Sequence, residues 1–308
     1  MTNHLDRSIL EETIENIVQS CKCIAPIASI IIVTHKTKKE TIASIINKLK
    51  GSSDHLFEIL LIDNNRTSDL VEIAKKEELF YIKLKENYGI TTGRNVGIIK
   101  ARGDILVFLD DDAMPGEKFI DEHIKAHRNY RICALRGKCL PLTDSIFNYF
   151  ATHYDLGDEV FPYGISLEGN SSFKKEILKS VGGFNSLLKG GAGHEGIEIS
   201  NRIIQKTKDA ESIIYYPGAV IYHDYSRTLL HYLKKQLRHE NHYKYIVENS
   251  PGFSDLYTSM VQRNKKGMKK PNFGTRIQIG LILKMSKCLR MLNSIVKKKV
   301  KIDDNVPL

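Results

Sequence analysis

Four short apolar runs alternate with helix-like stretches in the first part of the chain, and this alternation constrains the fold more than any other feature. The runs cover residues 27–34, 57–62, 80–84 and 105–109. Their β-branched residues and largely unbroken apolar character, as in IASIIIVT, are typical of strands that are buried on both faces. Helix-like stretches between such strands predict βαβ units, and therefore a mostly parallel sheet with helices on its faces.

Polar residues follow three of these predicted strands. Thr34 and His35 end the first strand, residues 63–65 follow the second, and residues 110–112 follow the fourth. In open parallel sheets, ligands bind beyond the carboxyl ends of the strands. Because these ends share one edge of the sheet, we expect the polar residues to converge there and form a binding site.

Three adjacent aspartates, Asp110, Asp111 and Asp112, follow the last apolar run. Neighbouring carboxylates repel one another unless a positive group lies among them. A divalent cation such as Mg²⁺ or Mn²⁺ is commonly shared between one or two carboxylates and the phosphates of a substrate. In an extended segment Asp110 and Asp112 face the same side, so these two are the expected metal ligands and Asp111 points elsewhere. A solvated acidic loop or a helix cap is the alternative interpretation.

Six motifs within residues 28–245 occur in the order found in the family 2 glycosyltransferases, and over this part the chain resembles that family of GT-A enzymes. The motifs are SIIIVTHK, FEILLIDNNRTSD, NYGITTGRNVGIIKARGDILVFLDDDAMP, EGNSSFKKEILKSVGGFN, GAGHEGIEISNRI and YYPGAVIYHDYSR. Each motif alone is a weak signal, but their common order is specific. The resemblance implies a Rossmann-like GT-A fold and transfer of a sugar from a nucleoside-diphosphate sugar.

The resemblance also implies roles for the residues that match the family's motifs. Nucleotide-binding positions are Thr34, Asp63, Asn64, Arg94 and Asp111, of which Asp111 would reach the ribose. Ligands of the metal, Mn²⁺ or Mg²⁺, are Asp110, Asp112 and His223. Acceptor-binding positions are Gly169, Asn170 and His194. Asn64 stands where aspartate is commoner in the family, which leaves the choice of nucleotide base open.

The expected catalytic base departs from the family's pattern. The second residue of the family's acidic pair is usually the base, and that position is Gly196 here. Since an inverting enzyme needs a carboxylate to take the acceptor's proton, we expect Glu195 to act as the base or to bind the acceptor, with Glu198 second. Glu198 has an alternative role in an ion pair with Arg202, four residues further on. The missing aspartate also leaves open a retaining mechanism or an inactive GT-A scaffold.

The expected function is metal-dependent sugar transfer, with inversion, from a UDP-sugar or next a dTDP-sugar. The expected acceptor is a saccharide, a lipid-linked molecule or a peptide. A nucleotidyltransferase would also use a parallel sheet and acidic metal ligands. It would need a glycine-rich phosphate loop soon after the first strand, and the segment THKTKKE contains no glycine.

The chain is expected to divide into three parts. An amphipathic helix is predicted over residues 5–21, with a capping box formed by Ser8 and Glu11. The three parts are an N-terminal helical extension over 1–25, a catalytic domain over 26–250 with a nucleotide-binding half at about 26–115 and an acceptor-binding half at about 116–250, and a basic helical tail over 251–308.

The basic charge of the chain belongs to the tail. Residues 263–301 contain thirteen Lys and Arg residues and no Asp or Glu, so of the net charge of +10 the tail segment carries +13 and the rest −3. This distribution argues against a nucleic-acid-binding domain. A basic helix with one apolar face suits an anionic membrane surface, or else packs on the catalytic domain or a partner subunit. That face is predicted to hold Leu281, Met285, Cys288, Leu292 and Ile295.

Cysteine usage and the N-terminal residues indicate the compartment. The five cysteines are odd in number and form no CxxC pair, and acidic residues stand where a signal peptide needs an apolar stretch. No uncharged apolar run reaches the roughly 18 residues of a membrane-spanning helix. We therefore expect a cytoplasmic protein, either free or peripheral on the inner face of the membrane.

Overall fold

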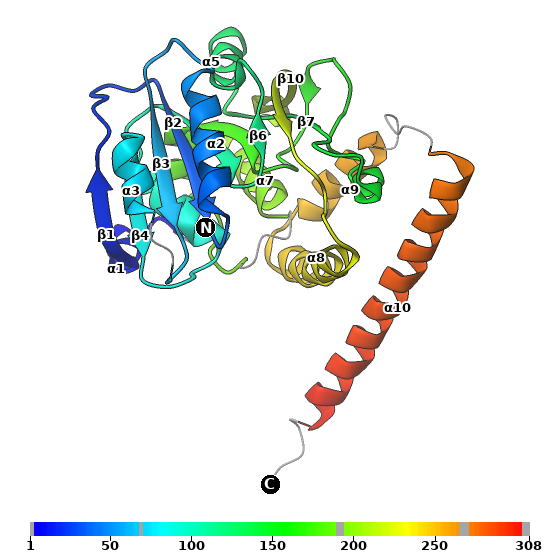
Figure 1. The fold of residues 1–308 in the computed structure, drawn as a ribbon. Helices are drawn as coiled ribbons and strands as arrows, with labels where there is room; N and C mark the ends of the chain where they lie inside the picture. Colours follow the sequence, from blue (N-terminus) through cyan, green and yellow to red (C-terminus); the bar gives the residue numbers. More distant parts are fainter. Residues whose placement is uncertain (1–2, 68–69, 189–193, 265–270, 304–308) are drawn as a thin grey trace.

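The computed structural model describes residues 3–67, 70–188, 194–264 and 271–303, and Figure 1 shows their course. Within these residues, ten strands form a single sheet, and helices lie on both of its faces. This arrangement confirms the predicted α/β class. Its N-terminal half carries the parallel strands that the apolar runs predict.

The N-terminal half consists of four parallel strands with helices between them. In the register of these strands, Thr34 lies opposite Asp63, and Val33 lies opposite Asp110. The polar strand ends therefore meet at one edge of the sheet, as expected. The elements of this half are β2 (Ala28–Thr34), α2 (Lys39–Lys50), β3 (Phe57–Asp63), α3 (Val71–Lys76), β4 (Phe80–Leu84), α4 (Ile90–Lys100) and β5 (Ile105–Asp110).

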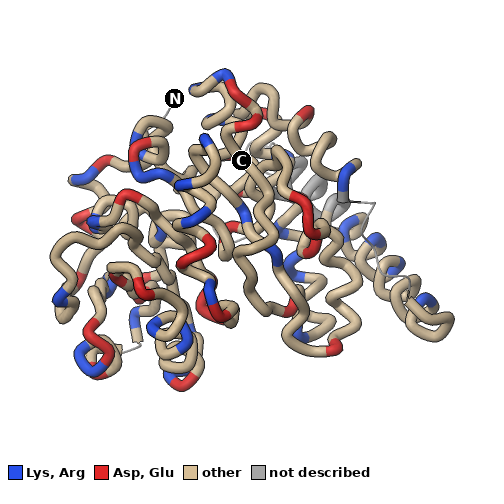
Figure 2. The backbone as a smooth tube through the Cα atoms, turned by 90° about the horizontal axis from the view of Figure 1, so that it is seen from above, with Lys and Arg blue, Asp and Glu red and all other residues tan. Residues whose placement is uncertain are grey.

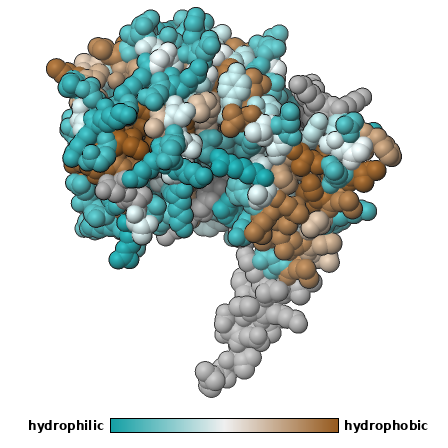
Figure 3. All heavy atoms as spheres, viewed as in Figure 1, coloured by the Kyte–Doolittle hydropathy of each residue, from teal (hydrophilic) through white to brown (hydrophobic). Residues whose placement is uncertain are grey.

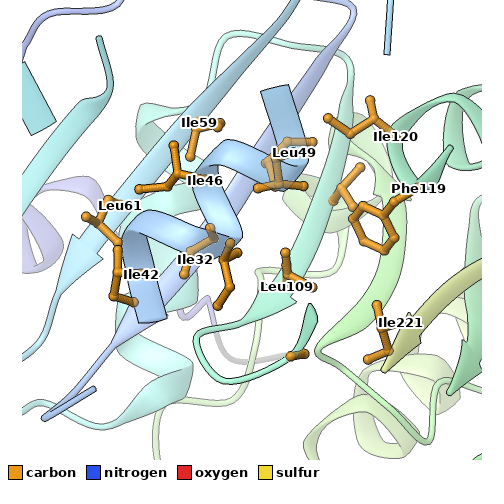
Figure 4. Close-up of a cluster of buried hydrophobic side chains, with 14 of the residues drawn as sticks. Ile32, Ile42, Ile46, Leu49, Ile59, Leu61, Leu109, Phe119, Ile120 and Ile221 are labelled. Atoms are coloured by element: carbon orange, nitrogen blue, oxygen red, sulfur yellow. The ribbon is translucent and has the colours of Figure 1, made fainter. Parts of the chain in front are cut away.

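Alternate side chains of the central strand β2 face opposite sides of the sheet. Ile30 and Ile32 are buried with the side chains of α2, a cluster that Figure 4 shows in close-up. Ile31 is buried on the other face, together with Val96 and Ile98 of α4. Burial on both faces explains why the sequence of this strand is apolar throughout rather than alternating.

The second half of the sheet is mixed. Its strand β9 runs antiparallel between β5 and β7, while β10 runs parallel to β7. Strand β10 is continuous across Pro217–Gly218, and its register against β7 shifts between Tyr216 and Val220. The elements of this half are β6 (Met114–Pro115), α5 (Phe119–Asn129), β7 (Ala134–Leu140), η1 (Ile146–Phe150), β8 (Phe161–Pro162), β9 (Asn170–Lys174), α6 (Lys175–Ser180), α7 (Glu195–Thr207), η2 (Ala210–Ser212) and β10 (Ile213–Tyr222).

The N-terminal segment differs from the long helix that the sequence predicts. A short helix α1 (Arg7–Glu12) is followed by strand β1 (Ile14–Gln19), which pairs antiparallel with β4. The cap of α1 is Asp6, whose carboxylate accepts hydrogen bonds from the backbone of Ser8 and Ile9. The predicted helix and capping box are therefore wrong. The open edge of β4 offers unpaired backbone groups, and pairing with them overrides the local helical pattern.

Three helices follow β10: α8 (Leu229–Asn249), α9 (Phe253–Asn264) and α10 (Phe273–Asp303). Phe253 and Met260 of α9 are buried in one cluster with Tyr215 of β10, so α9 belongs to the folded body. The predicted start of the tail at residue 251 stays a prediction, and it falls directly before α9, in which Phe253 and Met260 are buried. Among the described residues, no helix combines the length and apolar character needed to cross a bilayer.

Candidate active site

A cavity of about 710 Å³ lies at the edge of the sheet where the parallel strands end, and we call it the central cavity. The end of β5, helix α4, the start of α7 and helix α8 all contribute to its wall. Charged side chains of both signs face it: Arg94, Asp110, Asp112, Glu168, Glu195 and Lys235. The predicted convergence of polar residues at this edge is therefore present, with α7 and α8 closing the site.

The three adjacent aspartates have three different sets of partners. Asp110 lies 3.3 Å from a guanidinium nitrogen of Arg94. Asp111 accepts hydrogen bonds from the hydroxyl of Thr37 at 2.6 Å and from the backbone of His35 at 3.2 Å. Burial raises the pKa of Asp111 to about 6 in spite of these hydrogen bonds. Asp110 and Asp111 therefore have separate local partners, while the charges of Asp112 and Asp110 still contribute to the raised pKa of Asp111.

Asp112 pairs with His223, which follows β10. The distance between Asp112 Oδ1 and His223 Nε2 is 3.1 Å, and Arg227 lies 3.4 Å from the other carboxylate oxygen. Burial alone would raise the pKa of Asp112, but the hydrogen bond and charge of His223 and the charge of Arg227 outweigh it and hold that pKa below its ordinary value. Asp112 is therefore ionised at neutral pH.

The orientation of His223 is set by neighbouring residues. Its Nδ1 lies 3.0 Å from the hydroxyl of Tyr154. The buried guanidinium of Arg136 in turn donates hydrogen bonds to the carbonyls of His153 at 2.7 Å and Tyr154 at 2.9 Å. Partners of this kind fix the ring of a histidine that binds a metal through its other nitrogen.

The predicted metal ligands are only partly brought together. Within the ranges that the structure describes, no group of three His, Cys, Asp or Glu side chains surrounds a common point. Asp110 is directed to Arg94, whereas Asp112 and His223 meet. A carboxylate and an imidazole fit Mn²⁺ or Mg²⁺ when phosphate oxygens and water complete the shell. That Asp110 and Asp112 bind one metal together stays a prediction, and in this structure Arg94 lies beside one oxygen of Asp110.

The predicted nucleotide-binding residues divide into two groups. Arg94 and Asp111 line the central cavity. Thr34, Asp63 and Asn64 are buried at the same edge without lining it. The carboxylate of Asp63 accepts a hydrogen bond from the hydroxyl of Tyr81 at 2.7 Å.

The amide of Asn64 has a structural role in this structure. Its Nδ2 donates to the side chain of Asn87 at 3.0 Å and to the carbonyl of Gly89 at 3.1 Å, and its Oδ1 accepts from the backbone of Tyr88 at 3.0 Å. These bonds shape the loop that precedes α4, which carries Arg94. Asn64 therefore acts on the site through this loop.

Two of the predicted acceptor residues lie outside the central cavity. Asn170 is fully buried, and its Nδ2 donates to the carbonyls of Lys138 at 2.8 Å and Ala219 at 2.9 Å. Gly169 packs against Asp110, and a Cβ there would lie 2.0 Å from the carboxyl carbon of that residue. The expectation that Asn170 contacts the acceptor is corrected, because its amide links two strands of the sheet. His194 does line the cavity.

The two predicted catalytic carboxylates also separate. Glu195 is buried and lines the cavity, with one oxygen 3.9 Å from His242 Nδ1. Glu198 does not line the cavity and forms a two-pronged ion pair with Arg202, at 2.8 and 2.7 Å. The structure therefore supports the alternative interpretation of Glu198 and corrects its catalytic assignment.

The Glu198→Gln variant is expected to lose stability while keeping its ligand affinity. Glutamine retains the shape of the side chain but replaces a charge-assisted contact to a buried guanidinium, which costs about 2 kcal/mol of unfolding free energy. Urea unfolding measures this loss, and calorimetry with UDP and Mn²⁺ should give an unchanged affinity. A stable variant that no longer binds nucleotide would contradict the structural role.

Glu168 is a buried carboxylate of the cavity that motif reasoning missed. Its Oε1 accepts a hydrogen bond from the backbone of Gly196 at 2.6 Å. Burial and the charge of Glu195 raise the pKa of Glu168 to about 7, although Arg94 opposes this shift. Glu168 directly precedes Gly169 and Asn170, which the sequence predicts to bind the acceptor. No local sequence pattern indicates that Glu168, and not these two residues, lines the cavity.

Lys235 of α8 is the second missed residue. Its ammonium lies 3.9 Å from the centre of the Tyr225 ring and 3.4 Å from the carbonyl of that residue. Burial lowers the pKa of Lys235 to about 8, against the opposing influence of Asp110 and Glu168. The sequence indicates that α8 is rich in basic and aromatic residues, but the residue that faces the cavity depends on how the helix packs.

The chain has a mostly parallel α/β sheet, and a cavity lined by acidic and basic side chains lies at the carboxyl ends of its parallel strands. This combination of fold and site defines the class of protein. Solved structures with this fold include TarS residues 1–349 of S. aureus, at 16% identity and a TM-score of 0.52 over 77% of this chain and 71% of that one. They also include the mannosyltransferase PcManGT of Pyrobaculum calidifontis, at 14% identity and a TM-score of 0.51 over 88% and 84%. The fold is that of the GT-A glycosyltransferases.

Sequence comparison gives the family. Residues 29–147 match the model of Glycosyl transferase family 2. An uncharacterized glycosyltransferase of Bacillus subtilis, YfnE, is 33% identical over 106 residues, which are 33% of this chain and 27% of YfnE. Glycosyltransferase AglE of Haloferax volcanii is 24% identical over 183 residues, or 55% and 60%. Residues 29–147 are therefore similar to the family 2 glycosyltransferases, and the chain spans less than two thirds of the length of these two relatives.

Proposed function

We propose that this chain transfers a sugar from a nucleoside-diphosphate sugar to an acceptor hydroxyl, with a divalent cation held by Asp112 and His223. The observation that carries the proposal is the 3.1 Å Asp112–His223 pair, which lines the same cavity as Arg94 and Lys235. A carboxylate–imidazole pair among cations suits a metal-bound diphosphate. Such a cation would stabilise the negative charge that the diphosphate gains as it leaves the sugar.

The residues of the cavity have separate proposed roles toward the donor. Arg94 and Lys235 contribute positive charge where the leaving diphosphate becomes more negative, and stabilisation of this kind supplies much of the rate enhancement in many enzymes. Asp111, at the end of β5, is the candidate partner of the ribose. Asp110 holds Arg94 in place through their 3.3 Å contact.

The base of the donor nucleotide is proposed as uracil, with thymine next. A structure of TarS residues 1–349 contains UDP, and the PcManGT structure contains GDP-mannose and Mn²⁺. These ligands belong to those proteins, and together they favour a nucleoside diphosphate and a divalent metal here. Guanine is therefore included as a third candidate base.

The proposed acceptor is a saccharide, free or lipid-linked. His194 and His239 line the cavity with Tyr243 and Tyr257, and the rings of His194 and Tyr257 are 5.5 Å apart. Among the described residues, His194 Nδ1 and His239 Nε2 are buried and have no hydrogen-bond partner in the protein. Aromatic faces beside unused polar atoms suit the apolar faces and hydroxyls of a sugar. A peptide acceptor is the alternative.

Calorimetry with UDP, dTDP and GDP, each with Mn²⁺ or with EDTA, tests the proposed function. The expected result is Mn²⁺-dependent binding of one nucleotide. Incubation with the matching sugar donors and NMR of the product then gives the anomeric configuration, for which we propose inversion. Retention would favour the alternative mechanism, and the absence of any nucleotide binding would favour an inactive scaffold.

Helix α10 carries the proposed membrane contact. Phe273, Ile277, Leu281, Met285 and Leu292 are all exposed, with Phe273 at 79%. The first four of these residues are spaced four apart, and Leu292 follows Met285 by seven residues. This spacing places them along one side of the helix. Figure 3 shows hydrophobic residues gathered over the described part of α10. An unpartnered apolar stripe in a basic helix suits the surface of an anionic bilayer.

The charges of α10 support the same partner. Acidic and basic residues are interspersed over the rest of the fold (Figure 2). Residues 273–293 contain Arg276, Lys284, Lys287 and Arg290 and no acidic residue. The side chains of Ile295 and of residues 297–301, which the sequence prediction also used, lie outside the described residues.

The Lys284→Gln/Lys287→Gln variant is expected to bind vesicles of phosphatidylglycerol and phosphatidylcholine about 30-fold more weakly, because each basic residue near an anionic surface contributes about 1 kcal/mol. Flotation in a density gradient at low salt measures the bound fraction. A matched control, Lys118→Gln/Lys179→Gln, removes two exposed lysines from the body and should float like the wild type. A wild type that stays in the bottom fraction would contradict the membrane contact.

A further inference from the structure

Gly196 leaves a space in the first turn of α7, and the carboxyl group of Glu168 fills it. The backbone nitrogen of Gly196 donates to Glu168 Oε1 at 2.6 Å. A Cβ at position 196 would lie 2.7 Å from that same oxygen and 2.6 Å from the carbonyl oxygen of Ile165. Any side chain here would displace the carboxyl group, so Gly196 and the position of Glu168 depend on one another.

The loop that carries Glu168 is held against the edge of the sheet. The hydroxyl of Ser171 donates to the carbonyl of Glu168 at 2.8 Å. The next residue, Gly169, accepts a hydrogen bond from the backbone of Asp110 at 3.4 Å. The carboxyl group of Glu168 is therefore positioned relative to the end of β5, where the aspartates begin.

Charged groups from three helices act on Glu168. Glu195 of α7 is the neighbouring carboxylate, and its negative charge favours the protonated form of Glu168. Arg94 of α4 opposes that effect, and Lys235 of α8 also interacts favourably with Glu168. Glu168 is only 7% exposed and lines the cavity, so an acceptor can reach it while bulk water is largely excluded.

We propose that Glu168 is the catalytic base that takes the proton of the acceptor hydroxyl, and that Glu195 is a positioning residue beside it. This proposal rests on the proposed sugar transfer. In the step, the O–H bond of the acceptor breaks and its proton goes to the Glu168 carboxylate. The acceptor oxygen bonds to the anomeric carbon, and the bond from that carbon to the diphosphate breaks with its electron pair remaining on the diphosphate.

The acidity of Glu168 suits this role. A general base works best when its pKa is close to the operating pH, because it is then both largely ionised and basic enough to accept a proton. Burial and Glu195 bring the pKa of Glu168 to about 7. Activity should accordingly fall as the pH drops below about 7, since protonation of the carboxylate removes the base.

The Glu168→Gln variant is the first test. Hydrolysis of UDP-, dTDP- and GDP-hexoses to free sugar, with Mn²⁺ and with water as the acceptor, is expected to slow at least about 100-fold, as for the loss of a general base. The affinity for the nucleotide, measured by calorimetry, should stay within about twofold of the wild type. Glu168 is proposed to take the acceptor's proton and not to bind the nucleotide. Glu117→Gln, an exposed control on the surface, should match the wild type.

Two further variants separate a base from a residue that only supports the fold. In Glu168→Asp, a carboxylate is retained on a shorter side chain at the same position, and we expect at least a tenfold recovery over Glu168→Ala. In Glu195→Gln, the acid limb of the pH profile should move below its wild-type position. Carboxyl ¹³C NMR of glutamate-labelled protein should show a group titrating near pH 7 that is absent in Glu168→Gln and titrates lower in Glu195→Gln.

The outcomes distinguish this proposal from the proposed function. If the wild type binds no nucleotide, the proposed sugar transfer is overturned, and the proposal that Glu168 is its catalytic base is overturned as well. If nucleotide binds and Glu168→Gln hydrolyses the donor within threefold of the wild-type rate, only the role of Glu168 is overturned. A carboxyl group of Glu168 that titrates near pH 4 would also overturn it.

Discussion

The Asp112→Ala variant is expected to lose Mn²⁺-dependent nucleotide binding and to slow sugar transfer by about 10³-fold or more. A metal ion contributes several kcal/mol to the stabilisation of developing charge, and each 1.4 kcal/mol corresponds to about tenfold in rate. Asp112 is the carboxylate that meets His223, at 3.1 Å, whereas Asp110 is already paired with Arg94. Removing Asp112 therefore leaves the imidazole as the single side chain of the proposed metal pair.

Calorimetry with the selected nucleotide, with and without Mn²⁺, measures this effect directly. Asp255→Ala is a suitable control, because Asp255 is an exposed aspartate on α9. His223→Ala should weaken Mn²⁺ dependence in the same direction. If Asp112→Ala bound nucleotide and Mn²⁺ like the wild type while Asp110→Ala did not, the metal would belong to the first aspartate instead.

Replacing Lys235 by methionine is expected to lower the transfer rate by about 100-fold, as for the loss of one donor that stabilises developing negative charge. Methionine keeps the packing of the side chain against Tyr225. Stability should not fall, because an ammonium group that burial keeps poorly solvated is replaced by an apolar group. Steady-state rates and urea unfolding together distinguish this result from misfolding.

The adjacent Lys234 provides the control, since it is exposed on the same helix, and Lys234→Met should behave like the wild type. The pH dependence gives a second readout. Lys235 is charged below its pKa of about 8 and neutral above it, so nucleotide affinity should fall as the pH rises past 8. In Lys235→Arg the charge persists, and the affinity should stay level to pH 9. A level wild-type profile would contradict a role for the ammonium group.

Local sequence patterns predicted the first half of the fold well. The apolar runs gave β2, β3, β4 and β5 within a residue or so of their ends, because strands buried on both faces need continuous apolar sequence. The helix predicted for the N-terminal segment was wrong, because the structure of this segment depends on a partner far away in the chain. Its apolar spacing fits a helix, yet residues 14–19 pair with the open edge of β4, and that pairing is a long-range event.

The sequence predicted correctly those site residues whose position depends only on the course of the backbone. Asp110, Asp111 and Asp112 follow a central strand, so their position at the edge of the sheet comes from topology. Glu198 was misassigned because its partner depends on side-chain packing, whereas Glu195, one turn earlier on α7, lines the cavity. The side chain of Glu198 is turned toward Arg202.

By itself, the sequence determined the parallel strands of the first half, the edge at which its polar residues meet and the resemblance to family 2 glycosyltransferases, because strand pattern and motifs are read directly along the chain. Only the tertiary structure decided which charges face one another. Arg94 reaches Asp110, His223 reaches Asp112, and the carboxyl of Glu168 lies in the space left by Gly196. These partners come from elements far apart in the chain, so their pairing depends on how the helices and strands pack.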